Sequence, residues 1–194
     1  MLTTLEKTTD GQLFFSIPIM FGMLTIYDKF VPWFLGNQFL FVNRLIPFFS
    51  VLIVVVPLGM AISRQYLIPV GKVKQYNISV ILGAVISILT NVILLPQIGI
   101  YGSVCANILA ESFVLFSRIS SLYRYTRFRF NYQHIIKYVF SAFVMCFVTR
   151  MLTANYSPTL ITNIIQATIG SIIYLGLTLA LKCNLFFYLW KSKK

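Results

Sequence analysis

The sequence predicts an all-α, polytopic membrane protein in which six transmembrane helices form one lobe. Of its 194 residues, 58% are hydrophobic and only 10% are charged, whereas soluble domains average about 25% charged residues. Several apolar segments approach the roughly 20 residues that a helix needs to cross about 30 Å of hydrocarbon. We place six such segments in a single domain, residues 1–194: residues 12–27, 43–62, 76–95, 99–119, 135–154 and 159–181.

Lys and Arg residues are distributed unevenly between the connections of this arrangement. All but three of the 16 Lys and Arg residues fall on one side of the membrane, and the exceptions are Lys29, Arg44 and Arg150. Positive charge accumulates in cytoplasmic loops, so we expect both termini to be cytoplasmic. The cytoplasmic cations include Arg118 at the end of the fourth segment, which we count with the loop that follows it, and, at the end of the chain, Lys191, Lys193 and Lys194.

Residues with catalytic or metal-binding chemistry are few. A net charge of +12 does not indicate a nucleic-acid-binding protein, because so apolar a chain would not be a soluble binder. The spacing of the cysteines fits neither a zinc site nor a disulfide framework. We therefore expect no catalytic residue, no metal, no cofactor and no enzymatic activity. The remaining candidates are scattered along the chain: Glu6, Asp10, Asp28, Glu111 and His134.

The first segment is short, and its helix could extend past Asp28. The preceding stretch MLTTLEKTTDGQ is polar and of mixed charge, unlike a secretory signal, so we interpret it as a cytoplasmic lead into the first span. The following residues 28–39 are aromatic and contain Gly36. They form either an interfacial or re-entrant segment anchored by Trp33, or a simple outer loop.

The second segment contains Pro47 and Pro57. Proline removes a backbone donor and clashes with the preceding turn, so we expect this helix to bend. Interrupted helices often line the moving pathway of transporters, which makes both prolines candidate hinge residues. Proline is also common in ordinary membrane helices, and that interpretation stays open.

The third and fourth segments carry polar side chains at helical spacing. Residues four apart lie on one face of a helix, and polar groups in hydrocarbon need partners or water, so these faces should point inward. They either hold helices together or line a pathway. The residues are Ser87 and Asn91 in the third segment and Ser103, Asn107 and Glu111 in the fourth.

Glu111 places a carboxylate inside a predicted span. Such a group costs about 2.5–3.5 kcal/mol on insertion scales, and it usually faces a cavity or a partner. A role in transport, a structural ion pair and hydration near the inner surface are the three interpretations.

The last two segments are preceded by the sequence YRYTRFRFNY, residues 123–132, which interleaves arginines with aromatic rings. This pattern can bind single-stranded nucleic acid, but beside two membrane spans it favours anionic lipid headgroups. The sixth segment has a polar face that we expect to point inward. Its members are Asn163, Gln166, Gly170, Tyr174 and Thr178.

Three motifs follow one another between residues 65 and 112. They have the forms Gln-x-Leu-x-Pro-x-Gly-Lys, Asn-x-x-Leu-Ile-Pro-x-x-Gly (with Leu95 in place of Ile) and Gly-x-x-x-Ala-x-x-x-Ala-Glu. In their order and spacing they resemble the polysaccharide flippases of the Wzx type, in the multidrug/oligosaccharidyl-lipid/polysaccharide exporter superfamily. The likeness covers nearly the whole chain and is weaker after Phe130. The matching residues are Gln65, Leu67, Pro69, Gly71, Lys72, Asn91, Leu94, Pro96, Gly99, Gly102, Ala106, Ala110 and Glu111.

The resemblance implies one lobe of a MATE-like flippase fold, facing a second lobe across a central cavity in a bacterial cytoplasmic membrane. There, the headgroup of an undecaprenyl-diphosphate-linked oligosaccharide, an O-antigen or exopolysaccharide repeat unit, would cross while its lipid tail stays in the bilayer. Asn91, Asn107 and Glu111 would line or brace this substrate pathway. Arg44 and Arg150 are candidate contacts for the diphosphate, but both lie near the outer ends of helices, where extension toward outer headgroups is the favoured role. Family members usually have about twice as many spans. We therefore expect a truncated gene, whose partner would be a separate N-terminal lobe or a second copy of the chain.

Three other functions stay open. A drug or cation antiporter of the same superfamily would use Glu111 for ion coupling. A membrane-embedded glycosyl- or acyltransferase would need clustered carboxylates or histidines near one membrane face, and this sequence has none. The third alternative is a fragment without activity.

Overall fold

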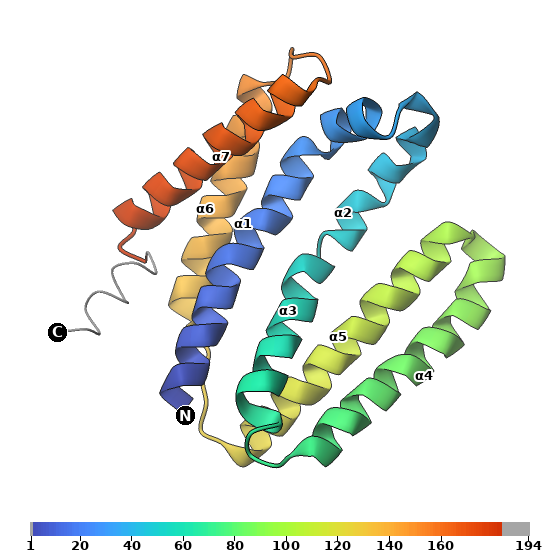
Figure 1. Cartoon of the computed structure of the whole chain (residues 1–194), viewed down its shortest axis with the longest axis vertical. Coiled ribbons are helices and arrows are strands. Elements are labelled where there is room, and N and C mark those ends of the chain that lie inside the picture. The colour runs from blue at the N-terminus through green and yellow to red at the C-terminus, as the bar shows by residue number, and fades with distance from the viewer. Residues whose placement is uncertain (1, 184–194) are drawn as a thin grey trace. The chain divides into compact units, whose positions relative to one another are not determined.

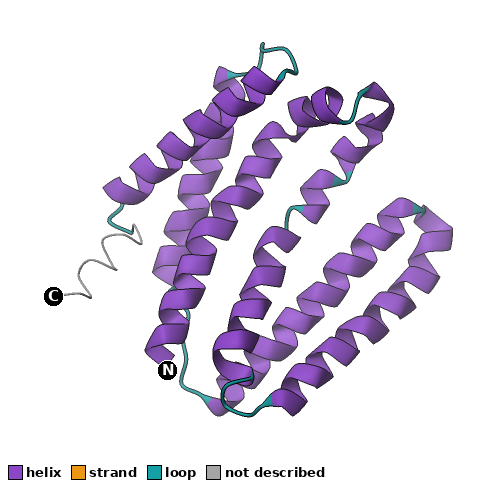
Figure 2. Cartoon of the chain, viewed as in Figure 1, coloured by secondary structure: helices purple, strands orange, loops and turns teal. Residues whose placement is uncertain are grey.

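The computed structural model of the chain describes residues 2–183, and within this range it consists of helices and their connections (Figures 1 and 2). Six helical segments are long and apolar enough to cross a membrane, which confirms the all-α fold class; the likeness to a flippase lobe stays a prediction. Lys191, Lys193 and Lys194, expected on the cytoplasmic side, lie outside the described residues. The elements are α1 Leu2–Phe34, η1 Asn37–Arg44, α2 Ile46–Phe49, α3 Leu52–Ile62, η2 Ser63–Leu67, α4 Val73–Ile98, α5 Ile100–Tyr125, α6 Tyr132–Leu152 and α7 Leu160–Ala180.

Helix α1 is longer than the predicted first span, because it takes in the polar start of the chain. The hydroxyls of Thr8 and Thr9 each donate a 2.9 Å hydrogen bond to a carbonyl one turn earlier, at Thr4 and Leu5. Their polar groups are thus satisfied within the helix, and Leu5 is fully buried. The start of the chain is therefore part of the first helix rather than a separate lead into it.

The segment after the first span consists of the end of α1, a turn and the start of the 3-10 helix η1. Gly36 makes the turn with φ of 89°, a conformation that favours glycine. At the end of α1, the ring centroids of Phe30 and Phe34 are 5.2 Å apart and those of Phe30 and Trp33 are 5.9 Å apart. Clustered rings at a helix end are typical of membrane-interface anchors.

The second span is interrupted. α2 and α3 are separated at Ser50 and Val51, and the Ser50 hydroxyl donates a 2.8 Å hydrogen bond to the carbonyl of Pro47. Pro47 lies in the first turn of α2, where its missing N–H costs nothing, whereas Pro57 lies inside α3. The break lies between the two prolines, and the bend and hinge role expected of Pro47 and Pro57 stay predictions.

The described parts of the chain form two compact units. Among the described residues, unit 1 comprises 2–12 and 51–130, and unit 2 comprises 13–50 and 131–183. Helix α1 contributes its first turns to unit 1 and the rest of its length to unit 2.

Unit 1 contains a tight antiparallel hairpin of α4 and α5, which lie side by side in Figure 1. Gly99 turns the chain with φ of 58°, and its N–H donates to the carbonyl of Leu95. Gly102 allows close contact, because a Cβ there would lie 2.5 Å from the carbonyl carbon of Leu94. A tight turn at Gly99 therefore joins the two helices, and Pro96 lies inside the last turns of α4.

The far end of this hairpin joins the apolar core of unit 1. Here α3 continues into η2, a π-helix in which the N–H of Ile68 donates to the carbonyl of Ser63, five residues earlier, at 3.0 Å. Such single π turns are frequent at functional sites. The core residues come from α1, α3, η2, α5 and the segment that follows α5: Leu5, Ile62, Tyr66, Leu67, Leu122 and Phe128.

Unit 2 packs the later turns of α1 with α6 and α7. Its centre is an aromatic group, in which the ring centroid of Phe14 lies 5.4 Å from that of Tyr138 and 5.5 Å from that of Tyr174. The Tyr174 hydroxyl donates a 2.8 Å hydrogen bond to the carbonyl of Phe14. The inward polar face predicted for the sixth segment is confirmed, since all five of its residues are buried: Asn163, Gln166, Gly170, Tyr174 and Thr178.

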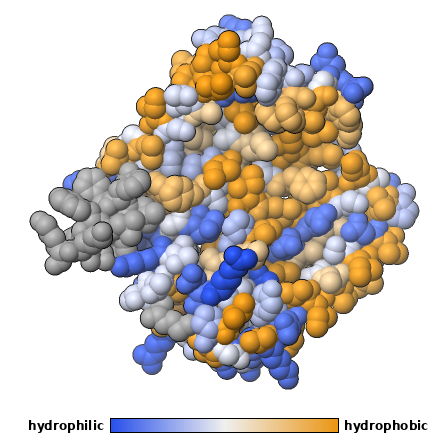
Figure 3. All heavy atoms as spheres, in the orientation of Figure 1, coloured by the Kyte–Doolittle hydropathy of each residue, from blue (hydrophilic) through white to orange (hydrophobic). Residues whose placement is uncertain are grey.

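Large apolar side chains cover the outside of both units. On α4, only Ser79 and Gly83 are buried, while Ile81, Ile88 and Val92 are all more than half exposed. Figure 3 shows apolar residues over much of the visible face. In water this surface would be unfavourable, whereas hydrocarbon solvates it, so the structure suits a multi-pass membrane protein.

Candidate functional site

The polar face of the α4–α5 hairpin in unit 1 is held by hydrogen bonds. The Ser103 hydroxyl donates to Asn91 Oδ1 at 2.9 Å, across the two helices. Asn91 Nδ2 donates to the carbonyl of Ser87 at 3.0 Å, and Asn107 Nδ2 donates to the carbonyl of Ser103 at 3.1 Å. The structure therefore brings together two of the predicted pathway residues, Asn91 and Asn107, through Ser103.

This polar face is open at Asn107 and Glu111. Asn107 is exposed and Glu111 is partly exposed, although their neighbours Leu109 and Phe113 on α5 are large exposed apolar residues. No described residue makes a hydrogen bond or ion pair with the Glu111 carboxylate. An amide and a carboxylate thus remain available to a ligand at the middle of a helix that is apolar enough to span a bilayer.

Arg118 extends this face into the interior of unit 1, two turns beyond Glu111. Its side chain is only 7% exposed. Its Nε donates to the Ser79 hydroxyl at 3.1 Å, and its guanidinium lies 5.3 Å from the ring centroid of Tyr76. Gly59 makes room for it, because a Cβ there would lie 3.2 Å from Arg118 Nη1.

The interpretation of Arg118 as a loop cation is therefore wrong. α5 continues to Tyr125, so Arg118 belongs to the helix and is buried. Its position just before the predicted end of the fourth segment gave no sign of this. The only sequence feature that could have indicated a buried Arg118 is the small size of Ser79 and Gly59, the two residues that contact its side chain.

The remaining candidate, Arg44, belongs to unit 2. It lies at the end of η1, where its side chain is exposed. Its role as a contact for a diphosphate stays a prediction.

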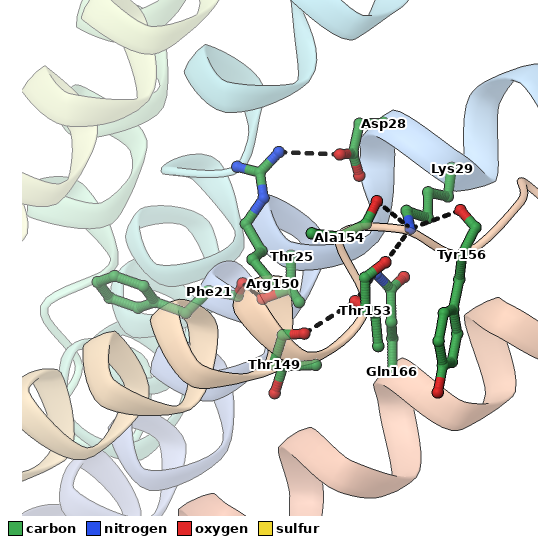
Figure 4. A network of polar contacts seen from close by, with 10 residues as sticks. All are labelled: Phe21, Thr25, Asp28, Lys29, Thr149, Arg150, Thr153, Ala154, Tyr156 and Gln166. Atoms are coloured by element: carbon green, nitrogen blue, oxygen red, sulfur yellow. Dashed lines mark hydrogen bonds and ion pairs between the residues drawn. The ribbon is translucent and has the colours of Figure 1, made fainter.

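Unit 2 contains a polar network that the sequence did not indicate, centred on the buried ammonium group of Lys29 (Figure 4). Lys29 is 9% exposed. Its Nζ donates to the carbonyl of Thr153, to that of Tyr156 at 2.7 Å and to that of Ala154 at 3.3 Å. All three ammonium protons are thus used to hold the connection between α6 and α7 against α1.

The same network continues along α6 and α7. Gln166 Nε2 donates to the Thr153 hydroxyl at 2.8 Å, and that hydroxyl donates to the carbonyl of Thr149 at 2.8 Å. Gln166 Oε1, Thr149 Oγ1 and Asn163 Oδ1 are buried and have no hydrogen-bond partner among the described residues. Because buried polar atoms are normally paired with protein or water, these three acceptors are exceptions within the described interior of unit 2.

An ion pair lies beside this network. Arg150 Nη2 is 3.0 Å from Asp28 Oδ2, and the two side chains are 41% and 39% exposed. The guanidinium also lies 5.3 Å from the ring centroid of Tyr27. Arg150, which we considered as a cation for the substrate or for outer headgroups, therefore has a partner on α1.

Replacing Asp28 with asparagine is expected to have a small effect. The pair is substantially exposed, and exposed ion pairs contribute about 0.2–1 kcal/mol, so the free energy of unfolding should fall by less than about 1 kcal/mol. Equilibrium unfolding of the purified protein in mixed micelles measures this change. Arg150→Gln should give a similar value, and a loss several times larger from either variant would contradict the assignment of a weak surface pair.

Comparisons with protein-family models, with curated proteins and with solved structures find no match to this chain. Within residues 2–183, no three His, Cys, Asp or Glu side chains lie close enough together to hold a metal ion. The chemistry of the described sites is that of hydrogen-bonding amides, hydroxyls and fixed charges. These groups can bind and guide a polar ligand.

Proposed function

We propose that this chain is one lobe of a transporter in the cytoplasmic membrane of a bacterium, and that it moves an undecaprenyl-diphosphate-linked oligosaccharide in surface polysaccharide biosynthesis. The observation that supports this most directly is the open polar face of α5. Asn107 and Glu111 are accessible on a span whose neighbouring side chains are apolar. Polar groups at this depth normally face a partner or a water-filled cavity.

The chemistry of this face suits a glycan. Amide and carboxylate groups donate and accept hydrogen bonds, as sugar hydroxyls do. Asn91 and Ser103 fix the start of the face by their mutual hydrogen bond, so its geometry is set before a ligand arrives. The lipid tail would remain in the bilayer, beside the apolar side chains that cover α4. The resemblance of residues 65–112 to polysaccharide flippases points to the same cargo.

A second lobe would complete the pathway. The polar face needs a cover that keeps hydrocarbon away from Asn107 and Glu111, and a facing lobe would provide one while leaving a cavity between the two. That lobe is an N-terminal lobe or a second copy of this chain. The excess of cations after α3, α5 and α7 favours a cytoplasmic location for those connections and for both termini.

Complementation of a flippase-null bacterial strain tests this proposal. We expect the chain to restore surface polysaccharide when an N-terminal lobe is co-expressed, and to fail without one. Asn107→Leu should lower export about fivefold, the equivalent of one hydrogen bond of about 1 kcal/mol. Phe113→Leu, an apolar exchange on the same helix, is the matched control. Restoration by the chain alone would contradict the need for a separate N-terminal lobe and would leave a second copy of this chain as the facing lobe.

Drug or cation antiport is the second candidate, and the accessible carboxylate of Glu111 is what favours it. A proton- or cation-coupled antiporter needs the charge, whereas a glycan pathway needs hydrogen bonding that glutamine retains. Glu111→Gln should therefore leave glycan export within about twofold of wild type, less than one hydrogen bond is worth. Drug-resistance assays of the same variant measure the alternative. Loss of resistance with unchanged glycan export would identify antiport as the activity.

A further inference from the structure

A pocket lies at the end of unit 1 opposite the α4–α5 turn. Its volume is about 650 Å³, and it is lined by Leu2, Tyr66, Arg124, Tyr125, Thr126 and Arg127. These residues come from the first turn of α1, from the π-helix η2 and from the end of α5 with the segment that follows it. The pocket therefore combines two guanidinium groups, two phenol rings and an apolar residue.

No described residue accepts a hydrogen bond or forms an ion pair with Arg124 or Arg127, and both side chains are exposed. Arg124 lies in the last turn of α5, where the helix dipole already favours a cation. Arg127 lies outside the helix and has no such compensation.

The pocket wall is held in place by its neighbours. The Thr126 hydroxyl donates to the carbonyl of Leu122 at 2.7 Å and accepts from the N–H of Phe128 at 3.3 Å. Phe128 is 3% exposed and belongs to the apolar core, and its ring centroid is 4.9 Å from that of Phe130. The segment that carries Arg127 is thus anchored on both sides.

A third cation lies beside the pocket. Lys72 Nζ is 3.9 Å from the ring centroid of Tyr125, a cation–π contact, and Gln75 Nε2 lies 3.4 Å from the Tyr125 hydroxyl. These contacts hold the Tyr125 phenol, which lines the pocket, beside Lys72. Around it, in residues 2–12, 63–76 and 122–130, cations outnumber the carboxylates Glu6 and Asp10; the cations are Lys7, Arg64, Lys72, Lys74, Arg124, Arg127 and Arg129.

The depth of the pocket matches the headgroup layer of a bilayer. At about 1.5 Å per residue, the 26-residue helix α5 is about 39 Å long, which exceeds the roughly 30 Å of hydrocarbon. Its last turn therefore reaches the interface, where Tyr side chains are enriched. Guanidinium groups bind phosphate through two parallel hydrogen bonds.

We propose that this pocket binds a phosphate group, and that the phosphate belongs to the headgroup of an anionic membrane lipid such as phosphatidylglycerol. Arg124 and Arg127 hold the phosphate, Lys72 adds positive charge behind Tyr125, and the apolar side of the pocket at Leu2 meets the upper part of the acyl chains. The inference is independent of the cargo, because it concerns the loop end of unit 1 and not the polar face of α5.

The full chain in nanodiscs tests the proposal. Nanodiscs of phosphatidylcholine are prepared with and without phosphatidylglycerol, and native mass spectrometry counts the lipids that each protein retains. Wild type should retain phosphatidylglycerol in preference to phosphatidylcholine. Arg127→Gln should reduce this retention about tenfold, the equivalent of about 1.5 kcal/mol for a hydrogen bond to a charged group. Arg127→Lys keeps the charge but loses the paired hydrogen bonds. Its retention of phosphatidylglycerol should lie between that of wild type and that of Arg127→Gln.

Arg129→Gln is the matched control, because Arg129 is an exposed cation of the same segment that does not line the pocket. It should reduce retention by no more than about fivefold, since a charge near an anionic surface contributes about 1 kcal/mol. Equal losses of retained phosphatidylglycerol in Arg127→Gln and Arg129→Gln would overturn the proposal. So would a wild type that shows no preference for phosphatidylglycerol over phosphatidylcholine. Unchanged circular dichroism of each variant shows that a loss reflects binding rather than folding.

A second arm distinguishes the source of the phosphate. Inorganic phosphate at millimolar concentration is added to wild type and Arg127→Gln in nanodiscs of phosphatidylcholine alone, and thermal unfolding is followed. No stabilisation, together with selective lipid retention, supports a lipid headgroup as the ligand. Stabilisation of wild type but not of Arg127→Gln would support the phosphate site and overturn its assignment to a lipid.

Discussion

Lys29→Met is expected to lower the free energy of unfolding by about 3 kcal/mol, the upper value for hydrogen bonds to a charged group. Methionine keeps an unbranched apolar stem of similar length, so packing along α1 changes little. What disappears is the ammonium group that donates to the carbonyls of Thr153, Ala154 and Tyr156. The carbonyl of the buried residue Thr153 then keeps only the N–H of Tyr156 as a donor among the described residues.

Equilibrium unfolding in mixed micelles, followed by circular dichroism, measures this loss. Arg44→Gln is the matched control, because Arg44 is an exposed cation of the same unit that has no hydrogen bond to a described residue, and it should change the free energy of unfolding by less than about 0.5 kcal/mol. Amide hydrogen exchange adds a local test. Lys29→Met should speed exchange in the connection between α6 and α7 more than elsewhere in unit 2. A stability within about 0.5 kcal/mol of wild type would show that the ammonium group does not hold this connection.

The helices could be predicted from the sequence because hydrocarbon imposes one simple requirement. A run of about 20 apolar residues has few other stable conformations in a bilayer, so α4 to α7 appear close to their predicted ranges. The start of α1 could not be predicted in the same way. Its threonines look like a polar linker, and the hydrogen bonds of Thr8 and Thr9 to their own helix become visible only in the structure.

The candidate sites also differ in how far they could be predicted from the sequence. Asn91, Ser103 and Asn107 follow from helical spacing within a single hairpin, and their connection is a local one. Lys29 and Arg118 depend on contacts between residues far apart in the chain, with Thr153 and Ser79 respectively. Spacing along the sequence cannot show such contacts. Both cations lie near the ends of helices, where the distribution of charge suggested only exposed loop residues.

Gly102→Ala is expected to lower the free energy of unfolding by about 3 kcal/mol, at the upper end of the cost of overpacking. Elsewhere in a helix, the same exchange normally stabilises by about 0.5–1 kcal/mol. Here the new Cβ would lie 2.5 Å from the carbonyl carbon and oxygen of Leu94 and 2.8 Å from the backbone N of Leu95. Because these are backbone atoms, α4 and α5 must move apart, and the hydrogen bond between Ser103 and Asn91 lengthens with them.

Two further exchanges make this test specific. Gly176→Ala on α7 meets no atom within 4 Å, so it should be neutral or slightly stabilising. Gly83→Ala would place its Cβ 2.4 Å from Val114 Cγ2, a side-chain atom, so Val114→Ala in the same protein should restore most of the lost stability. No truncation of a side chain can relieve the clash at Gly102. Gly102→Ala and Gly176→Ala could instead have the same free energy of unfolding. In that case the helices of the hairpin are not in backbone contact, and Asn91 is not held by Ser103 beside the polar face of α5.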